Sequence, residues 1–190
     1  MHGDKRVRHE FQTVEECDEA MVDRWNKTVQ PGDKVYHLGD FAFDPKIIKK
    51  FRERLNGSVS IILGNHDPSE PWVWDWKLAS GQHAFRKVQS WEFFGPQGSK
   101  PIFVACHYPV HPMCITEHHN NDRQLACVHG HEHRNLVPST AATPRQFLLR
   151  ADDGFLGDGR YINICVENTN YTPIHYDEIV AIMKTRGFNV

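Results

Sequence analysis

Four short apolar runs in this chain end in the same kinds of polar residue, and this pattern constrains the fold more than any other feature. The runs lead into Gly39-Asp40, Gly64-Asn65-His66-Asp67, Cys106-His107 and Gly130-His131-Glu132-His133. In open α/β sheets, functional sites form where the carboxyl ends of strands deliver their loops to one edge. The pattern therefore predicts that these four segments are strand ends whose polar residues meet.

Two strands and two helices are predicted in the first third of the chain. Thr13-Val14-Glu15-Glu16 has the sequence of a capping box, and the helix that it begins should run to about Val29. Residues 34–38 and 59–63 are β-prone runs, and Pro45 suits the start of a second helix between them. A strand, a helix and a strand at this spacing indicate a parallel pair joined by a crossover helix.

The second half of the chain is predicted to be more antiparallel. The expected elements are strands at 85–94 and 101–106 around a hairpin loop at 95–99, strands at 125–128 and 161–166, a long connection at 134–158 and a closing helix at 177–184. No internal repeat or linker divides the sequence. We expect one domain over residues 1–190, with mixed sheets and helices on the outside.

Composition narrows the classes of protein. Hydrophobic residues make up 39% of the 190 residues, which is ordinary for a globular chain and argues against disorder. A formal net charge of -2 argues against an extended nucleic-acid surface, and no apolar run is long enough to cross a membrane. The 5 cysteines share no CxxC spacing, and no signal peptide is visible, so a cytoplasmic protein with reduced thiols is expected.

The polar residues at the strand ends are of one chemical kind. One Asp, one Asn and several His delivered together are typical ligands of a transition metal, and they suit Mn, Fe, Zn, Ni or Co better than Ca or Mg. Most of the other histidines are expected on the surface, while His37 and His129 are expected to support the site without binding metal. Asp67 has two interpretations, one in the site and one as the cap of a following helix.

The same motifs give the sequence a family resemblance. His37-Leu38-Gly39-Asp40, Leu63-Gly64-Asn65-His66-Asp67, His107 and the Gly-His-x-His at 130–133 resemble, in order, the motifs of the calcineurin-like metallophosphoesterases. Residues 166–174 also look like the C-terminal region of small bacterial and phage members. The resemblance implies an α/β fold that is a four-layer αββα sandwich, with two mixed β-sheets and flanking helices.

The resemblance also implies roles for individual residues. The implied metal ligands are Asp40, Asn65, His107, His131 and His133. Asp40 would bridge two ions, of which His133 would bind the second. His66 would donate to the scissile phosphate or protonate the leaving oxygen, and Asp67 would hold its imidazole. Two ions (Mn, Fe, Zn or Ni) would supply a hydroxide for in-line hydrolysis of a phosphodiester or a small phosphomonoester.

The sequence departs from the family at one point. Members open with a strand that ends in Asp-x-His and supplies two further ligands to the metal that His133 would bind, and this chain shows no such strand. A truncated or misassigned start, replacement by His2, Asp4 or His9, and a single-metal or non-catalytic variant are the three explanations. The missing strand would leave a neighbour such as 34–38 with unpaired backbone groups, which suggests a homodimer across that edge.

The alternative function is a non-catalytic interaction or scaffold module on the same fold. Retention of His66 and Asp67 favours the enzyme, because a scaffold has no chemical need for them. The expected partner is a small phosphate ester, with nucleotides among the candidates, and neither a membrane nor a long nucleic acid. The alternating Trp72, Trp74 and Trp76 are interpreted as core or subunit contacts, or as a stacking surface at the rim of the site.

Overall fold

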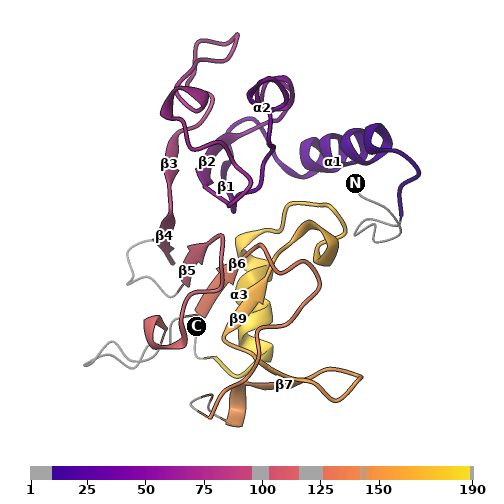
Figure 1. Cartoon of the computed structure of the whole chain (residues 1–190), viewed down its shortest axis with the longest axis vertical. Coiled ribbons are helices and arrows are strands. Elements are labelled where there is room, and N and C mark those ends of the chain that lie inside the picture. The colour runs from indigo at the N-terminus through magenta and orange to yellow at the C-terminus, as the bar shows by residue number, and fades with distance from the viewer. Residues whose placement is uncertain (1–9, 96–102, 116–125, 142, 144, 189–190) are drawn as a thin grey trace.

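The computed structural model describes residues 10–95, 103–115, 126–141, 143 and 145–188 (Figure 1). Its upper and lower parts each contain a β-sheet, and the strands β3 and β4 follow one another along one side of the molecule. Within the described residues, no helix is both long enough and apolar enough to cross a membrane. His2, Asp4 and His9, the substitutes named in one of the three explanations, lie outside the described residues, as does most of the predicted hairpin loop.

The first sheet is parallel throughout its described strands. It has the order β1-β2-β3, with β1 at Lys34–His37, β2 at Ser58–Ile62 and β3 at Lys87–Gln89. Helix α2 (Pro45–Arg52) connects β1 to β2, and helix α1 (Val14–Thr28) precedes them. The predicted parallel pair with its crossover helix is therefore confirmed.

Both helices begin as local sequence chemistry predicts. The hydroxyl of Thr13 accepts from the backbone N–H of Glu16 at 3.0 Å, while the Glu16 carboxylate accepts from the N–H of Gln12 at 2.8 Å. At α2, the Asp44 carboxylate accepts from the N–H of Lys46, and a proline occupies the first turn. These contacts satisfy N–H groups that have no partner inside a helix.

The second sheet is mixed, and it is less antiparallel than the sequence predicted. Its order is β4-β5-β6-β9, with β4 at Trp91–Phe94, β5 at Phe103–Cys106, β6 at Ala126–His129 and β9 at Tyr161–Asn163. Only the pair β4–β5 is antiparallel, whereas β5–β6 and β6–β9 are parallel. Helix α3 (Tyr176–Thr185) packs Ile179 and Met183 against this sheet in one core cluster.

The single strand predicted at 85–94 is wrong. The chain leaves the first sheet after β3 and enters the second sheet at β4, with Ser90 between them. β3 pairs in parallel with β2, and β4 pairs antiparallel with β5. Hydrophobic patterning shows that a segment is extended but cannot show which sheet it joins, so the two strands look like one.

The connection predicted at 134–158 also contains structure. Strands β7 (Leu148–Arg150) and β8 (Leu156–Asp158) form a two-stranded antiparallel sheet after the short 3₁₀ helix η3 (Arg145–Phe147). The described residues also include three other short 3₁₀ helices, η1 (Pro71–Val73), η2 (Pro112–Cys114) and η4 (Val166–Asn168).

Two main cores lie on the faces of these sheets. One includes Ile48 of α2, Val59 and Ile61 of β2, and Trp74 and Phe85 from the segment before β3. The other joins Leu38 and Ile62 of the first half to residues of β5, β6, β9 and α3. The mixed α/β sandwich expected from the sequence is confirmed, while the single domain over 1–190 and the homodimer stay predictions.

Candidate metal centre

The predicted ligands lie on loops that follow four strands. Asp40 comes after β1, His107 comes directly after β5, and His131 and His133 come after β6. Asn65, His66 and Asp67 come from the loop after β2. Because β1 and β2 are parallel, as are β5 and β6, each pair delivers its loops in the same direction.

The loops after β1 and β2 approach each other closely at two glycines. Gly39 has a φ of +92°, and Asp40 follows with a φ of +53°. A Cβ atom on Gly39 would lie 2.5 Å from the backbone nitrogen of Gly64 and 2.7 Å from Nδ1 of His107. Glycine is required there because a side chain would push these loops apart.

Asp67 holds the same two loops together. Its Oδ2 atom accepts from the N–H groups of Asp40 and Gly64, each at 2.8 Å, and its Oδ1 atom accepts from the N–H of Phe41 at 2.7 Å. Within the described residues these are the hydrogen bonds of the Asp67 carboxylate, and none joins it to the His66 imidazole. The structure thus gives the Asp67 carboxylate a different set of contacts from the one that the family resemblance implied.

Three of the predicted ligands form one compact group. One ligand atom from each of Asp40, His107 and His131 lies within 4.8 Å of the others. The Nε2 atom of His107 lies 3.0 Å from Oδ1 of Asn65, 3.2 Å from Nδ1 of His131 and 3.6 Å from Oδ2 of Asp40. Together with Asn65, these three residues point nitrogen and oxygen atoms at one place.

The contacts of the two ring nitrogens of His107 indicate what this place can hold. Its Nδ1 atom lies 2.7 Å from the carbonyl oxygen of Leu38, which can only accept, so Nδ1 carries the proton. In the neutral ring, Nε2 then presents a lone pair toward the oxygen atoms of Asn65 and Asp40. Lone pairs facing one another repel, and a cation among them turns the repulsion into attraction. Mixed imidazole, amide and carboxylate donors fit a divalent transition metal.

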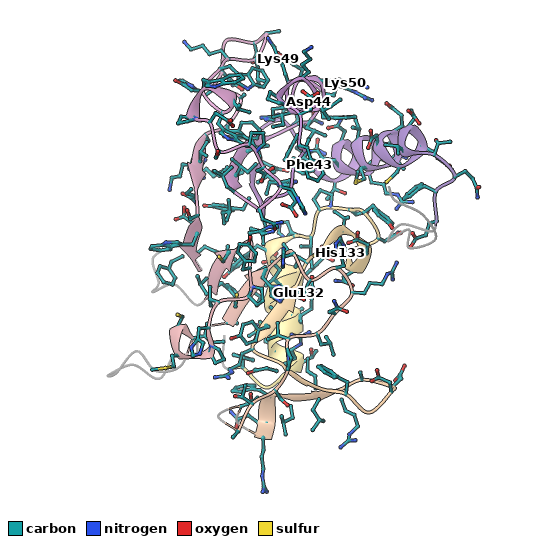
Figure 2. All side chains as sticks on the ribbon, in the orientation of Figure 1. Phe43, Asp44, Lys49, Lys50, Glu132 and His133 are labelled. Atoms are coloured by element: carbon teal, nitrogen blue, oxygen red, sulfur yellow. The ribbon has the colours of Figure 1, made fainter. Side chains whose placement is uncertain are left out.

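His133 lies beside this group and is not a member of it. Its Nδ1 atom lies 3.3 Å from Oε1 of Glu167, whose side chain is 1% exposed. Its carbonyl oxygen accepts from the side-chain amides of Asn163 at 2.8 Å and Asn168 at 2.6 Å, and its φ is +49°. Glu167 therefore orients one nitrogen of this ring and leaves the other for a ligand. Figure 2 shows His133 near the middle of the view, below Phe43.

His66 stands at the exposed side of the group. Its backbone N–H donates to Oδ1 of Asp40 at 2.9 Å, which places the residue next to the candidate metal site. Its ring packs against Phe43, with ring centroids 4.7 Å apart. Because the side chain is exposed, a substrate can reach the imidazole.

The two histidines expected to support the site make contacts of that kind. His37 accepts through Nδ1 from the N–H of Gly39 at 3.2 Å, and His129 donates through Nδ1 to the carbonyl of Gly130 at 2.8 Å. Burial lowers the pKa of both histidines, and for His37 it outweighs the opposing effect of the carboxylates of Asp67 and Asp40. The half-buried position of His37 and the buried position of His129 therefore favour neutral rings.

Two residues near the site were not predicted from the sequence. The ring centroid of Tyr108 lies 4.8 Å from the ring centroid of His107 and 4.6 Å from the ring centroid of His131. Glu167 is the buried partner of His133. Tyr108 directly follows a predicted ligand, and Glu167 lies in the segment that resembles small phosphoesterases, so position along the chain was the available signal for both.

Comparisons with known proteins found one matching family model and similar proteins. A model of the calcineurin-like phosphoesterase superfamily domain matches residues 9–149. An uncharacterized protein of Methanocaldococcus jannaschii is 29% identical over 184 residues, which cover 95% of this chain and 82% of that protein. A protein of unknown function from Aquifex aeolicus has a crystal structure that matches with a TM-score of 0.55 at 21% identity, over 93% of this chain and 89% of that one. The last likeness concerns the fold alone.

Proposed function

The chain belongs to the calcineurin-like phosphoesterase superfamily, and from this premise we propose that it hydrolyses a phosphodiester or a small phosphomonoester with bound divalent metal. The observation that carries the proposal is the convergence of Asp40, His107 and His131 within 4.8 Å, with Oδ1 of Asn65 beside Nε2 of His107. When bound, the metal would activate a water molecule and neutralise charge on the phosphoryl group.

The residues around the metal have separate tasks in this proposal. Asn65, His107 and His131 bind the first ion together with Asp40. His133 and Asp40 hold a second ion, a role supported by the Glu167 carboxylate, which occupies Nδ1 of His133 and leaves Nε2 for a ligand. Mn, Fe, Zn and Ni are the candidate metals because imidazole ligands suit them.

His66 is the proposed proton donor. Its backbone is fixed by Asp40 while its imidazole is exposed, so the ring can contact a phosphate ester next to the metal ligands. Histidine is a common general acid in enzymes that work near neutral pH, so the ring suits protonation of the leaving oxygen. Asp67 contributes by fixing the two loops that carry Asp40 and His66, since it accepts from backbone N–H groups of both.

The test combines metal analysis with hydrolysis of bis(p-nitrophenyl) phosphate and p-nitrophenyl phosphate. We expect hydrolysis that depends on added Mn, Ni or Zn and is abolished by a chelator. His83→Ala is the matched control, because the side chain of His83 is 64% exposed and is not among the predicted site residues. Hydrolysis of neither ester with any of the metals contradicts the proposal. Metal binding without hydrolysis would instead favour the non-catalytic module on the same fold.

A further inference from the structure

A hollow of about 410 Å³ opens beside His66. Its lining includes Phe43, His66, Pro68, Glu70 and Trp72. It adjoins the candidate metal centre, because the backbone of His66 is hydrogen bonded to Asp40 at 2.9 Å. Pockets of about 300–1,000 Å³ are the usual size for small ligands, so the hollow is large enough for part of a substrate.

Two aromatic side chains of this hollow face solvent. Phe43 is 74% exposed and Trp72 is 68% exposed. The neighbouring Trp74 shows the contrast, because it is 4% exposed and packs against Phe85 with centroids 5.2 Å apart. The core therefore accounts for Trp74 but not for Trp72. Exposed aromatic rings at a binding site are the usual means of holding another planar ring by stacking.

The charges of the residues that line the hollow indicate which part of a ligand can bind there. Glu70 is exposed on the wall and would repel a second phosphate group inside the hollow. Asp67 also lines it, although its carboxylate oxygens accept from backbone N–H groups. An uncharged aromatic group thus fits the hollow, while the phosphate fits the edge at His66 and the metal ligands.

We propose that the hollow between Phe43 and Trp72 binds the nucleobase of a nucleotide ester whose phosphate lies at His66. The proposal rests on the phosphoesterase function and names its substrate class. Phe43 directly precedes Asp44, the N-cap of α2, and Trp72 belongs to η1, so both aromatic residues are placed by short helical elements. Figure 2 shows Phe43 on the side of α2 that faces the lower half of the molecule.

The test compares two ligands that carry the same phosphate. Adenosine 5′-monophosphate and ribose 5-phosphate are titrated into the same metal-loaded protein, and each dissociation constant is measured by calorimetry. We expect the nucleotide to bind about tenfold more tightly, which is the effect of one base stacked on aromatic side chains. Phe43→Leu and Trp72→Leu keep apolar bulk without the aromatic face and should each reduce this ratio severalfold.

Trp91→Leu is the matched control, because Trp91 is 55% exposed and contacts Phe93 in the other sheet. It should leave the ratio unchanged. Equal binding of the two ligands by the original protein overturns the proposal, and so does a ratio that survives loss of both Phe43 and Trp72. Equal binding together with hydrolysis of bis(p-nitrophenyl) phosphate refutes the base site and leaves the phosphoesterase function standing. Preference for the nucleotide without hydrolysis of either ester refutes the function instead.

Discussion

His107 and His66 lie on loops at the same edge, yet their surroundings suit them to different tasks. His107 is 1% exposed, and both of its ring nitrogens contact other polar atoms of the site. His66 is exposed and is attached to the group through its backbone N–H on Asp40. Removal of the His107 side chain deletes one of the candidate metal ligands, whereas removal of the His66 side chain leaves every candidate ligand in place.

We therefore expect His107→Ala to lose bound metal and His66→Ala to retain it. The His66→Ala variant should lower the turnover number about 100- to 10,000-fold, which is the usual contribution of a general acid or base. Metal content by mass spectrometry and hydrolysis of bis(p-nitrophenyl) phosphate check the two effects separately. Equal loss of metal in both variants would contradict the roles assigned to these residues.

Asp67 has a structural task that can be measured without any substrate. Its carboxylate is the acceptor for the N–H groups of Asp40, Phe41 and Gly64. Asp67→Ala leaves these donors without their partner, so the free energy of unfolding should fall by about 2 kcal/mol and metal binding should weaken. Urea denaturation and a metal titration give the two numbers.

The control for this variant is Asp75→Ala, because the Asp75 side chain is 84% exposed. That change should alter the free energy of unfolding by less than about 0.5 kcal/mol. An Asp67→Ala protein as stable as the control would mean that the loops keep their geometry without the carboxylate.

The candidate ligands could be found from the sequence because each lies directly beyond an apolar run in a recognisable motif. The contacts of Asp67 could not be found from the sequence, since the motif fixes the place of Asp67 beside His66 but not the direction of the Asp67 carboxylate. Glu167 could not be paired with His133 either, because the two residues are brought together by the turn after β9 and not by any spacing in the chain.

At the scale of elements, the end of α2 depends on one buried cation. Arg52 is 2% exposed, and its guanidinium donates to the carbonyl oxygens of Ala84 at 2.6 Å, Leu55 at 2.7 Å and Gly57 at 2.8 Å. These carbonyls belong to the turn between α2 and β2 and to the segment before β3. One side chain thus ties the crossover helix to the segments that lead into β2 and β3.

Arg52→Met keeps much of the buried length of this side chain and removes all of its donors. Three carbonyl oxygens then lose their partner, and we expect the free energy of unfolding to fall by about 3 kcal/mol. Thermal and urea unfolding measure the loss. The exposed Lys46 on the same helix is the control, and Lys46→Met should change stability by less than about 0.5 kcal/mol. Similar stability for the two variants would show that water replaces the guanidinium.

The regular elements of the first half were predictable because local signals agree with tertiary packing there. A cap, an amphipathic run and a stop mark α1, and a proline and a buried strand mark α2 and β2. The division of 85–94 into β3 and β4 was not predictable, because it depends on which sheet offers a free edge at each residue. The same holds for β7 and β8, which pair with each other inside a segment rich in loop residues.

On the scale of the whole molecule, the second half carries a buried ion pair far along the chain from the metal ligands. Asp158 and Arg160 are 2% and 3% exposed, and their closest atoms are 2.6 Å apart. Thr143 adds a hydrogen bond to the same carboxylate at 2.8 Å. Burial alone would raise the pKa of Asp158, but the hydrogen bonds from Arg160 and Thr143 outweigh it and hold the pKa below its usual value.

The sign of this shift predicts how stability depends on pH. Because the folded state lowers the pKa of Asp158, the unfolded state binds the proton more readily, and its pKa is near 3.8. The stabilisation is therefore fully present above that value and is lost as the pH falls further, through the folded pKa. Asp158→Asn removes this contribution and leaves Arg160 buried without its counter-ion.

We expect Asp158→Asn to lower the free energy of unfolding by about 3 kcal/mol at pH 7. The difference in the free energy of unfolding between the variant and the original protein (the gap) should narrow as the pH falls from 4 toward 3. Acid then removes the same contribution from the original protein. Urea denaturation at a series of pH values measures the gap. Asp23→Asn, at an exposed pair with Lys27, serves as the control and should give a small gap at every pH. A gap for Asp158→Asn that stays constant down to pH 3 would show that the carboxylate is not what stabilises Arg160.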